Sequence, residues 1–152
     1  MHALALKVPP LAQIIIAIAL VYAIAQLSIA PFRFALTDTL SGLFLLAGAI
    51  VAFMGLRQFR LAKTSTNPLN PNKASSLVTS GIYQYTRNPM YLGMVLVLIG
   101  AIIEFASLLG FIVLPLFISY MTQFQIKPEE RIVESLFGEE YVEYKQRVRR
   151  WI

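Results

Sequence analysis

Residues 90–126 read MYLGMVLVLIGAIIEFASLLGFIVLPLFISYMTQFQI, an apolar run in which Glu104 is the only charged residue. As a single α-helix this run would be about 55 Å long, whereas the hydrocarbon core of a bilayer is about 30 Å thick. One crossing cannot use that length. We therefore expect two transmembrane helices, at residues 90–105 and 107–126, that form a helical hairpin with a tight turn near Glu104.

Two more apolar stretches precede this hairpin. Residues 8–30 are long enough to cross a bilayer, and Pro9 and Pro10 stand at their start, where a missing N–H costs a helix little. Residues 40–60 form the next span, after the capping side chains of residues 37–39. The sequence therefore predicts an all-α polytopic membrane protein with about four transmembrane helices.

The composition agrees with a membrane protein of one domain. The 152 residues are 57% hydrophobic and 14% charged, and their mean hydropathy is +0.66, whereas soluble domains have about 45–50% apolar and 25% charged residues. The chain has no cysteine and a single histidine, His2. Disulfides, thiolate nucleophiles and cysteine-built metal sites are therefore excluded, and we expect no metal site.

The basic residues flank the apolar runs and do not form a stripe with interleaved aromatic residues, so we expect no nucleic-acid partner. Twelve of the 13 lysines and arginines fall on one side of the expected spans, and Arg33 alone falls on the other. Positive residues accumulate on the cytosolic side of a membrane. Both termini and a polar loop at residues 63–88 are therefore expected in the cytosol, with a prokaryotic inner membrane as the expected location. Residues 129–150 are expected to form a charged cytosolic helix on the membrane surface or over that loop.

The hairpin brings two polar segments together. Its entrance carries Arg87 and Asn88, and its exit carries Glu129 and Glu130, so these side chains are expected close together at one membrane boundary. A guanidinium beside two carboxylates indicates either a partly buried binding site or a plain salt bridge that ties the mouth of the hairpin. The pattern alone leaves both interpretations open.

The second half of the chain also carries a pattern in several parts: LVTSGIY at residues 77–83, RNPMYLG at residues 87–93, the pair Glu129-Glu130, and FGEEY at residues 137–141. From about Ser75 onward the chain resembles the isoprenylcysteine carboxyl methyltransferase family and the related phospholipid methyltransferases. The resemblance implies a single membrane-embedded domain over residues 1–152, with S-adenosylmethionine held under a cytosolic cover. It implies methyl transfer to a lipid-like or small apolar acceptor at the cytosolic face, onto a carboxylate, thiol or amine.

The resemblance also implies roles for particular residues. Contacts with S-adenosylmethionine are implied for Ser75, Ser76, Leu77, Val78, Tyr83, Asn88, Pro89, Met90, Tyr91 and Glu129. Glu129 would take the methionyl ammonium, while Arg87, Asn88 and Glu130 would form the catalytic centre. In that centre Arg87 would either take the cofactor carboxylate or brace Glu130.

Two positions depart from the family pattern. Asn88 replaces the usual histidine and cannot act as a base near neutral pH. Gln125, with Lys127 close by, replaces an arginine that binds substrate in prenylcysteine enzymes. These two residues are the expected substrate contacts, and the acceptor they imply is lipid-like or otherwise apolar and not specifically a prenylcysteine.

Two other interpretations stay open. Membrane sterol and enone reductases, which use NADPH, carry a similar Arg-His-Pro-x-Tyr segment, but they typically have asparagine where this chain has Met90. Asn88 and Gln125 also allow a membrane scaffold that has lost catalysis.

Overall fold

The structure, a computed structural model, describes residues 6–27, 31–63 and 75–152. The long elements in these ranges are helices: α1 (Pro10–Gln26), α2 (Thr37–Leu61), α3 (Pro89–Glu104), α4 (Val113–Tyr120) and α5 (Lys127–Arg147). Shorter helices are η2 (Gly81–Gln84), η3 (Leu108–Ile112) and the π-helix η4 (Met121–Ile126). The predicted all-α fold is confirmed. The end of the first predicted span, residues 28–30, and most of the predicted polar loop, residues 64–74, lie outside the described residues.

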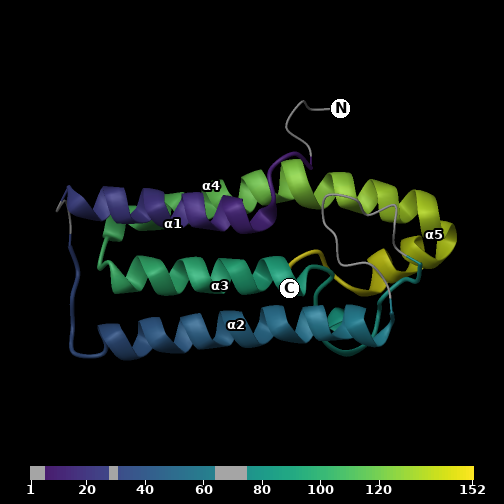
Figure 1. The fold of residues 1–152 in the computed structure, drawn as a ribbon, viewed down its shortest axis with the longest axis horizontal. Coiled ribbons are helices and arrows are strands. Elements are labelled where there is room, and N and C mark those ends of the chain that lie inside the picture. The colour runs from purple at the N-terminus through teal and green to yellow at the C-terminus, as the bar shows by residue number, and fades with distance from the viewer. Residues whose placement is uncertain (1–5, 28–30, 64–74) are drawn as a thin grey trace.

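The helices form a bundle in which α3 lies between α2 and the pair α1 and α4 (Figure 1). Proline stands in the first turn of both α1 and α3, where its fixed φ suits a helix start. The hairpin turn follows α3, with Ala106 at a φ of 50° and the Ser107 side chain accepting a hydrogen bond from Gly110 N. α3 and α4 therefore run side by side in opposite directions.

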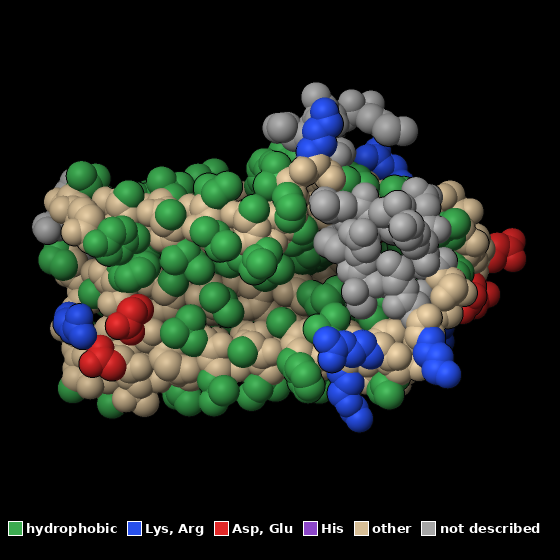
Figure 2. Space-filling view, viewed as in Figure 1, with side chains coloured by type: hydrophobic (Ala, Val, Ile, Leu, Met, Phe, Trp, Pro, Cys, Tyr) green, Lys and Arg blue, Asp and Glu red, His purple; other side chains and the backbone are tan. Residues whose placement is uncertain are grey.

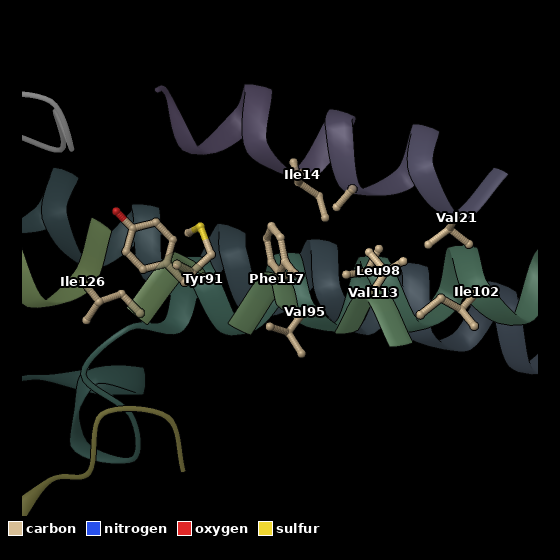
Figure 3. Close-up of a cluster of buried hydrophobic side chains, with 11 residues drawn as sticks. Ile14, Val21, Tyr91, Val95, Leu98, Ile102, Val113, Phe117 and Ile126 are labelled. Carbon is tan, nitrogen blue, oxygen red and sulfur yellow. The ribbon is translucent and has the colours of Figure 1, made fainter. Parts of the chain in front are cut away.

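The apolar core fills the space between α1, α3 and α4. Its buried residues include Ile14 and Val21 from α1, Leu98 and Ile102 from α3, and Phe117 from α4 (Figure 3). Tyr91 lies at one end of this cluster, and its hydroxyl oxygen points away from the apolar side chains. The core therefore ends in a polar group at the mouth of the hairpin.

α2 and α3 approach each other through glycine. A Cβ on Gly93 would lie 2.6 Å from the Gly48 carbonyl oxygen and 2.8 Å from the Ala52 Cβ, so no larger residue fits there without displacement. Small residues allow membrane helices to approach closely. The resulting van der Waals contacts stabilise the packing, because the hydrophobic effect does not drive helices together inside a bilayer.

The outer surface is that of an integral membrane protein. α2 and the run Leu108–Arg147 are long and apolar enough to cross a membrane, and α1 and α3 are shorter apolar helices. Hydrophobic side chains cover the long middle part of the face in Figure 2, whereas charged side chains gather at its two ends. Large apolar residues such as Leu46, Ile50 and Phe53 on α2 are exposed, as expected for a surface that faces lipid.

The helix after the hairpin does not stop at Pro128, where the sequence predicts a boundary before a separate helix at residues 129–150. Proline removes one helical N–H and leaves the carbonyl four residues earlier without its donor. That carbonyl belongs to Phe124, and it accepts the backbone N–H of Leu6 at 3.1 Å. The wider π-helical turn η4 lies just before the proline. The apolar part of the run therefore ends at Ile126, but the helix continues into the charged tail.

The tail then folds back toward α3. Gly138 has φ 53° and ψ −126°, a conformation that is essentially restricted to glycine, and it kinks α5 there. α5 ends at Arg147, and the chain end returns to the start of α3 (Figure 1). The kink thus brings a third segment to the mouth of the hairpin.

Candidate functional site

Three segments meet where α3 and α5 begin. The first is residues 86–91, with Asn88 at the N-cap of α3. The second is residues 125–130, which joins η4 to α5. The third is residues 148–151, which follows α5 and hydrogen-bonds to the first segment. Sequences far apart in the chain therefore share one site.

Glu129 lies at the centre of this site. Tyr91 Oη donates to its Oε1 at 2.6 Å, and Gln125 Nε2 donates to the same oxygen at 2.5 Å. Glu129 lies beyond the apolar part of the membrane run, and burial raises the pKa of its carboxyl to about 7, although both hydrogen bonds act to lower it. Both donors reach Oε1, so neither of these two hydrogen bonds occupies Oε2.

Glu130 is shared by two arginines. Arg87 Nη2 lies 3.1 Å from its Oε1, and Arg150 donates from Nε to Oε1 at 3.0 Å and from Nη2 to Oε2 at 2.7 Å. The side chains of Arg87 and Glu130 are only 9% and 12% exposed. The hydrogen bonds to Glu130 raise the pKa of Arg150 further above its usual range. Two cations and one anion leave this buried cluster with a net positive charge.

Arg87 has unused hydrogen-bonding capacity. Its Nε and Nη1 are buried and have no hydrogen-bond partner among the described residues. Unpaired buried N–H groups of a charged side chain are costly, and a planar guanidinium is suited to hold a carboxylate with two N–H groups. The cluster can therefore accept an anionic group at Arg87.

Asn88 contacts the returning chain end. Its Nδ2 donates to the Arg150 carbonyl at 2.9 Å, and Thr86 Oγ1 donates to the same carbonyl at 3.4 Å. The backbone N–H of Arg87 donates to the Arg149 carbonyl at 3.0 Å. The Asn88 amide thus holds the tail against the start of α3, which is a positioning role.

Tyr83 belongs to an aromatic cluster next to these residues. It is 4% exposed, its ring meets Phe59 edge to face with centroids 5.5 Å apart, and its carbonyl accepts from Tyr144 Oη at 2.7 Å. Val78 is buried in the same cluster, and Leu77 packs against it. Burial raises the pKa of Tyr83 well above its usual value, so the phenol is neutral. An open pocket of about 360 Å³ adjoins this cluster, lined by Thr79, Gln84, Tyr144, Arg147 and Val148.

The remaining expected site residues fall in different places. Ser76 Oγ donates to the Ala62 carbonyl at the end of α2, and Ser75 precedes it in the same extended segment. Pro89 and Met90 face α2, because a Cβ on Gly55 would lie 3.0 Å from a side-chain carbon of each. The structure therefore brings these residues to the α2 side of the site.

Gln125 and Lys127 were expected together, but the structure separates them. Gln125 is fully buried against Glu129, whereas Lys127 is exposed and donates to Gln123 Oε1 on the surface. Residues two apart on a helix point about 200° apart, so one of them must leave a site that the other enters. The structure does not place Lys127 in the site.

Sequence reasoning missed Arg150 and Gln13. In the sequence Arg150 is one of several basic residues of the tail that indicate only the membrane orientation, yet it makes the bidentate contact to Glu130. Gln13 is a single polar residue within the apolar run of the first span, and its Nε2 lies 3.3 Å from Gln125 Oε1. The polar side chain of Gln13 within an apolar span is the feature of the sequence that could have indicated its role.

A carboxylate and a guanidinium occur together in this part of the molecule, and each suits one charged group of a ligand. A free carboxylate oxygen on Glu129 can accept an ammonium, and the unpaired N–H groups of Arg87 can take a carboxylate. An α-amino acid carries both groups on one carbon, so a carboxylate and a guanidinium are the chemical types that suit the methionyl end of S-adenosylmethionine. Among the described residues, no group of three or more histidine, cysteine, aspartate or glutamate side chains could hold a metal ion.

A family model described as phospholipid methyltransferase matches residues 36–140. An uncharacterized protein of Haemophilus influenzae is 43% identical over 63 residues, which are 41% of this chain and all of that protein. Protein-S-isoprenylcysteine O-methyltransferase of Schizosaccharomyces pombe is 31% identical over 77 residues, which are 51% of this chain and 33% of that protein. Protein-S-isoprenylcysteine O-methyltransferase B of Arabidopsis thaliana is 33% identical over 72 residues, 47% of this chain and 36% of that protein. The matches thus span about a third of each of these two enzymes, and no solved structure matches.

Proposed function

The chain belongs to the phospholipid methyltransferase family, and we propose that it transfers a methyl group from S-adenosylmethionine to a lipid-like or small apolar acceptor at the membrane boundary. The observation that carries this proposal is that two kinds of group occur at the mouth of the hairpin: the Glu129 carboxylate, whose two hydrogen bonds both go to Oε1, and Arg87, whose Nε and Nη1 have no hydrogen-bond partner among the described residues. The two similar O-methyltransferases support the reaction class.

Different residues would hold the methionyl end and the adenine end of the cofactor. Glu129 would accept the methionyl ammonium, and Arg87 would take the carboxylate while Glu130, itself held by Arg150, keeps the Arg87 guanidinium in place. Tyr83, Leu77 and Val78 lie in the aromatic cluster beside these groups, which suits an apolar ring system such as adenine. When bound, the cofactor supplies a sulfonium methyl group as the electrophile.

The protein's own part in the reaction would be positioning and exclusion of water. A nucleophilic atom of the acceptor forms a bond to the methyl carbon while the carbon–sulfur bond breaks, and the bonding electron pair stays on sulfur. A thiol, or an amine that carries an N–H, also releases a proton to water, whereas a carboxylate or a tertiary amine has none to lose. Orientation of two reactants in a dry site contributes several kcal/mol to such displacements. Asn88 supplies no base, which is consistent with its contact to the Arg150 carbonyl.

The acceptor would enter from the bilayer beside Gln125. This residue of η4 is fully buried next to Gln13 of α1, and its side chain is neutral. A neutral amide offers hydrogen bonds but no charge, so the proposed acceptor is an apolar molecule with a small polar head. The site would face the cytosol of a prokaryotic cell, since the basic residues gather at this end of the helices.

Ligand-dependent stability in detergent tests the proposal. S-adenosylmethionine and S-adenosylhomocysteine should each raise the unfolding temperature of the purified protein in a saturable way, because a ligand that binds only the folded state stabilises it. NADPH should not. Stabilisation by NADPH instead would favour a reductase, and no shift with any of the three compounds would favour a non-catalytic scaffold. Transfer of labelled methyl groups to extracted membrane lipids would then identify the acceptor.

A further inference from the structure

The first helix reaches the site through a chain of buried amides. Gln13 on α1 is 7% exposed and donates from Nε2 to Gln125 Oε1 at 3.3 Å. Gln125 in turn donates from Nε2 to Glu129 Oε1. α1 lies before residue 36, where the family match begins, so that match gives Gln13 no role.

One backbone carbonyl fixes the direction of this chain. The Val8 carbonyl accepts a hydrogen bond from Gln13 Nε2 at 2.8 Å. Because a carbonyl can only accept, the end of the Gln13 amide that faces Val8 must be the nitrogen. The same nitrogen faces Gln125, which must therefore present its oxygen to Gln13 and its nitrogen to Glu129.

The direction of the Gln125 amide favours one protonation state of Glu129 over the other. With its N–H toward the carboxyl, Gln125 favours the ionised form of Glu129, because a hydrogen bond to the charged form stabilises that form. With the amide reversed, two acceptor oxygens would face each other unless Glu129 were protonated. A protonated carboxyl carries no charge for an ammonium group.

Gln13 also carries a stability cost. Its Oε1 is buried and has no hydrogen-bond partner among the described residues. A leucine of similar size would fill the space without burying an unpaired oxygen. The buried oxygen of Gln13 therefore lowers the stability of the fold, while its nitrogen orients the Gln125 amide.

We propose that Gln13 is a positioning residue, which fixes the Gln125 amide with its N–H toward Glu129 and so keeps Glu129 ionised to receive a cation. The identity of that cation, the ammonium of the cofactor, rests on the proposed function. The other titratable groups that face Glu129 are Tyr91 on α3, which also hydrogen-bonds to Gln125, Tyr83 on η2 and its own neighbour Glu130. The Gln13 side chain donates its hydrogen bonds to the Val8 carbonyl and to Gln125.

Infrared titration of the free protein in detergent tests this role without any cofactor. The protonated-carboxyl band of Glu129 is assigned as the band that E129Q lacks, and its midpoint is measured in wild type, Q13L, Q125L and the double variant. Q125L should raise the midpoint by about one pH unit or more, because it removes a hydrogen bond to the charged form. Q13L should raise it in the same direction. The double variant should match Q125L, because Gln13 acts only through Gln125.

Q26L is the matched control, since Gln26 lies exposed at the other end of the same helix. An unchanged midpoint in Q13L would overturn the proposal even if the unfolding temperature changed, and so would a double variant clearly beyond Q125L. Calorimetry with S-adenosylhomocysteine on the same variants keeps the two ideas apart. Absence of binding by the wild type would contradict the proposed function, whereas the infrared midpoints would still decide the role of Gln13.

Discussion

At the scale of the residue, the site depends on the charge of one carboxylate. Glu129 is held by Tyr91 and Gln125 through a single oxygen, which leaves the other oxygen for a ligand. Replacement by glutamine keeps the size of the side chain and removes the charge. We expect Glu129→Gln to weaken S-adenosylhomocysteine binding at least tenfold, because hydrogen bonds to charged groups contribute about 1.5–3 kcal/mol. Calorimetry measures this loss. Glu140→Gln on the exposed face of α5 is the control, and equal affinities of the two variants would remove Glu129 from the site.

The same carboxylate predicts a dependence on pH. Burial raises the pKa of Glu129 to about 7 in the free protein. Below that pH the carboxyl is protonated and must lose its proton before it can hold an ammonium, so affinity falls as pH falls and approaches a tenfold loss per unit. Between about pH 7.5 and pH 6, S-adenosylhomocysteine affinity should decrease roughly eightfold. Calorimetry across this range checks the slope, which should vanish in Glu129→Gln. A flat profile in the wild type would contradict the assignment.

At the scale of the element, α2 and α3 depend on contact between glycines. A Cβ on Gly93 would overlap both the Gly48 carbonyl and Ala52, and all of the nearest groups are backbone or short side chains that cannot swing aside. We expect Gly93→Ala to lower the free energy of unfolding by about 1–3 kcal/mol, the usual cost of overpacking. Gly42→Ala on α2 is the matched control, because nothing lies within 4 Å of its Cβ position. Thermal unfolding in detergent compares the two, and equal stabilities would show that the helices separate readily.

The structure confirms the predicted hairpin but not the predicted helix boundary before α5. The length of the apolar run predicts a hairpin, and a hairpin places Arg87 near Glu130, which the structure joins at 3.1 Å. The proline rule predicts a boundary at Pro128, but the helix continues through the π-helical turn η4, and the Phe124 carbonyl accepts a hydrogen bond from the distant Leu6 N–H. A donor more than a hundred residues away leaves no local signal. The prediction that Lys127 lies in the site is wrong for a different reason: residues two apart on a continuous helix point in nearly opposite directions, so Lys127 turns away from Gln125.

At the scale of the whole molecule, the site depends on contacts between the two ends of the chain and its middle. The positions of Arg150 and Gln13 could not be deduced from their neighbours in sequence. A basic tail residue looks like a topology charge, and one glutamine in an apolar helix looks like a tolerated interruption. Their roles follow from the kink at Gly138 and from packing of α1 on α4, which are tertiary events. The residues of the central motif were accessible to sequence reasoning because the hairpin alone brings them close.

The orientation of the whole bundle follows from its charges and can be measured directly. The proposed site lies at the end of the bundle that carries the basic residues, whereas Arg33 and Asp38 form an exposed ion pair at the other end, where α2 begins. A cytosolic site is therefore expected with Asp38 outside the cell. Because the chain has no cysteine, one introduced thiol reports on one position. In intact bacterial cells a membrane-impermeant maleimide should label Asp38→Cys and not Glu140→Cys, and disruption of the cells should expose the latter. The reverse pattern would place the site outside the cytosol, where cells do not supply S-adenosylmethionine. It would therefore contradict both the proposed orientation and the proposed reaction.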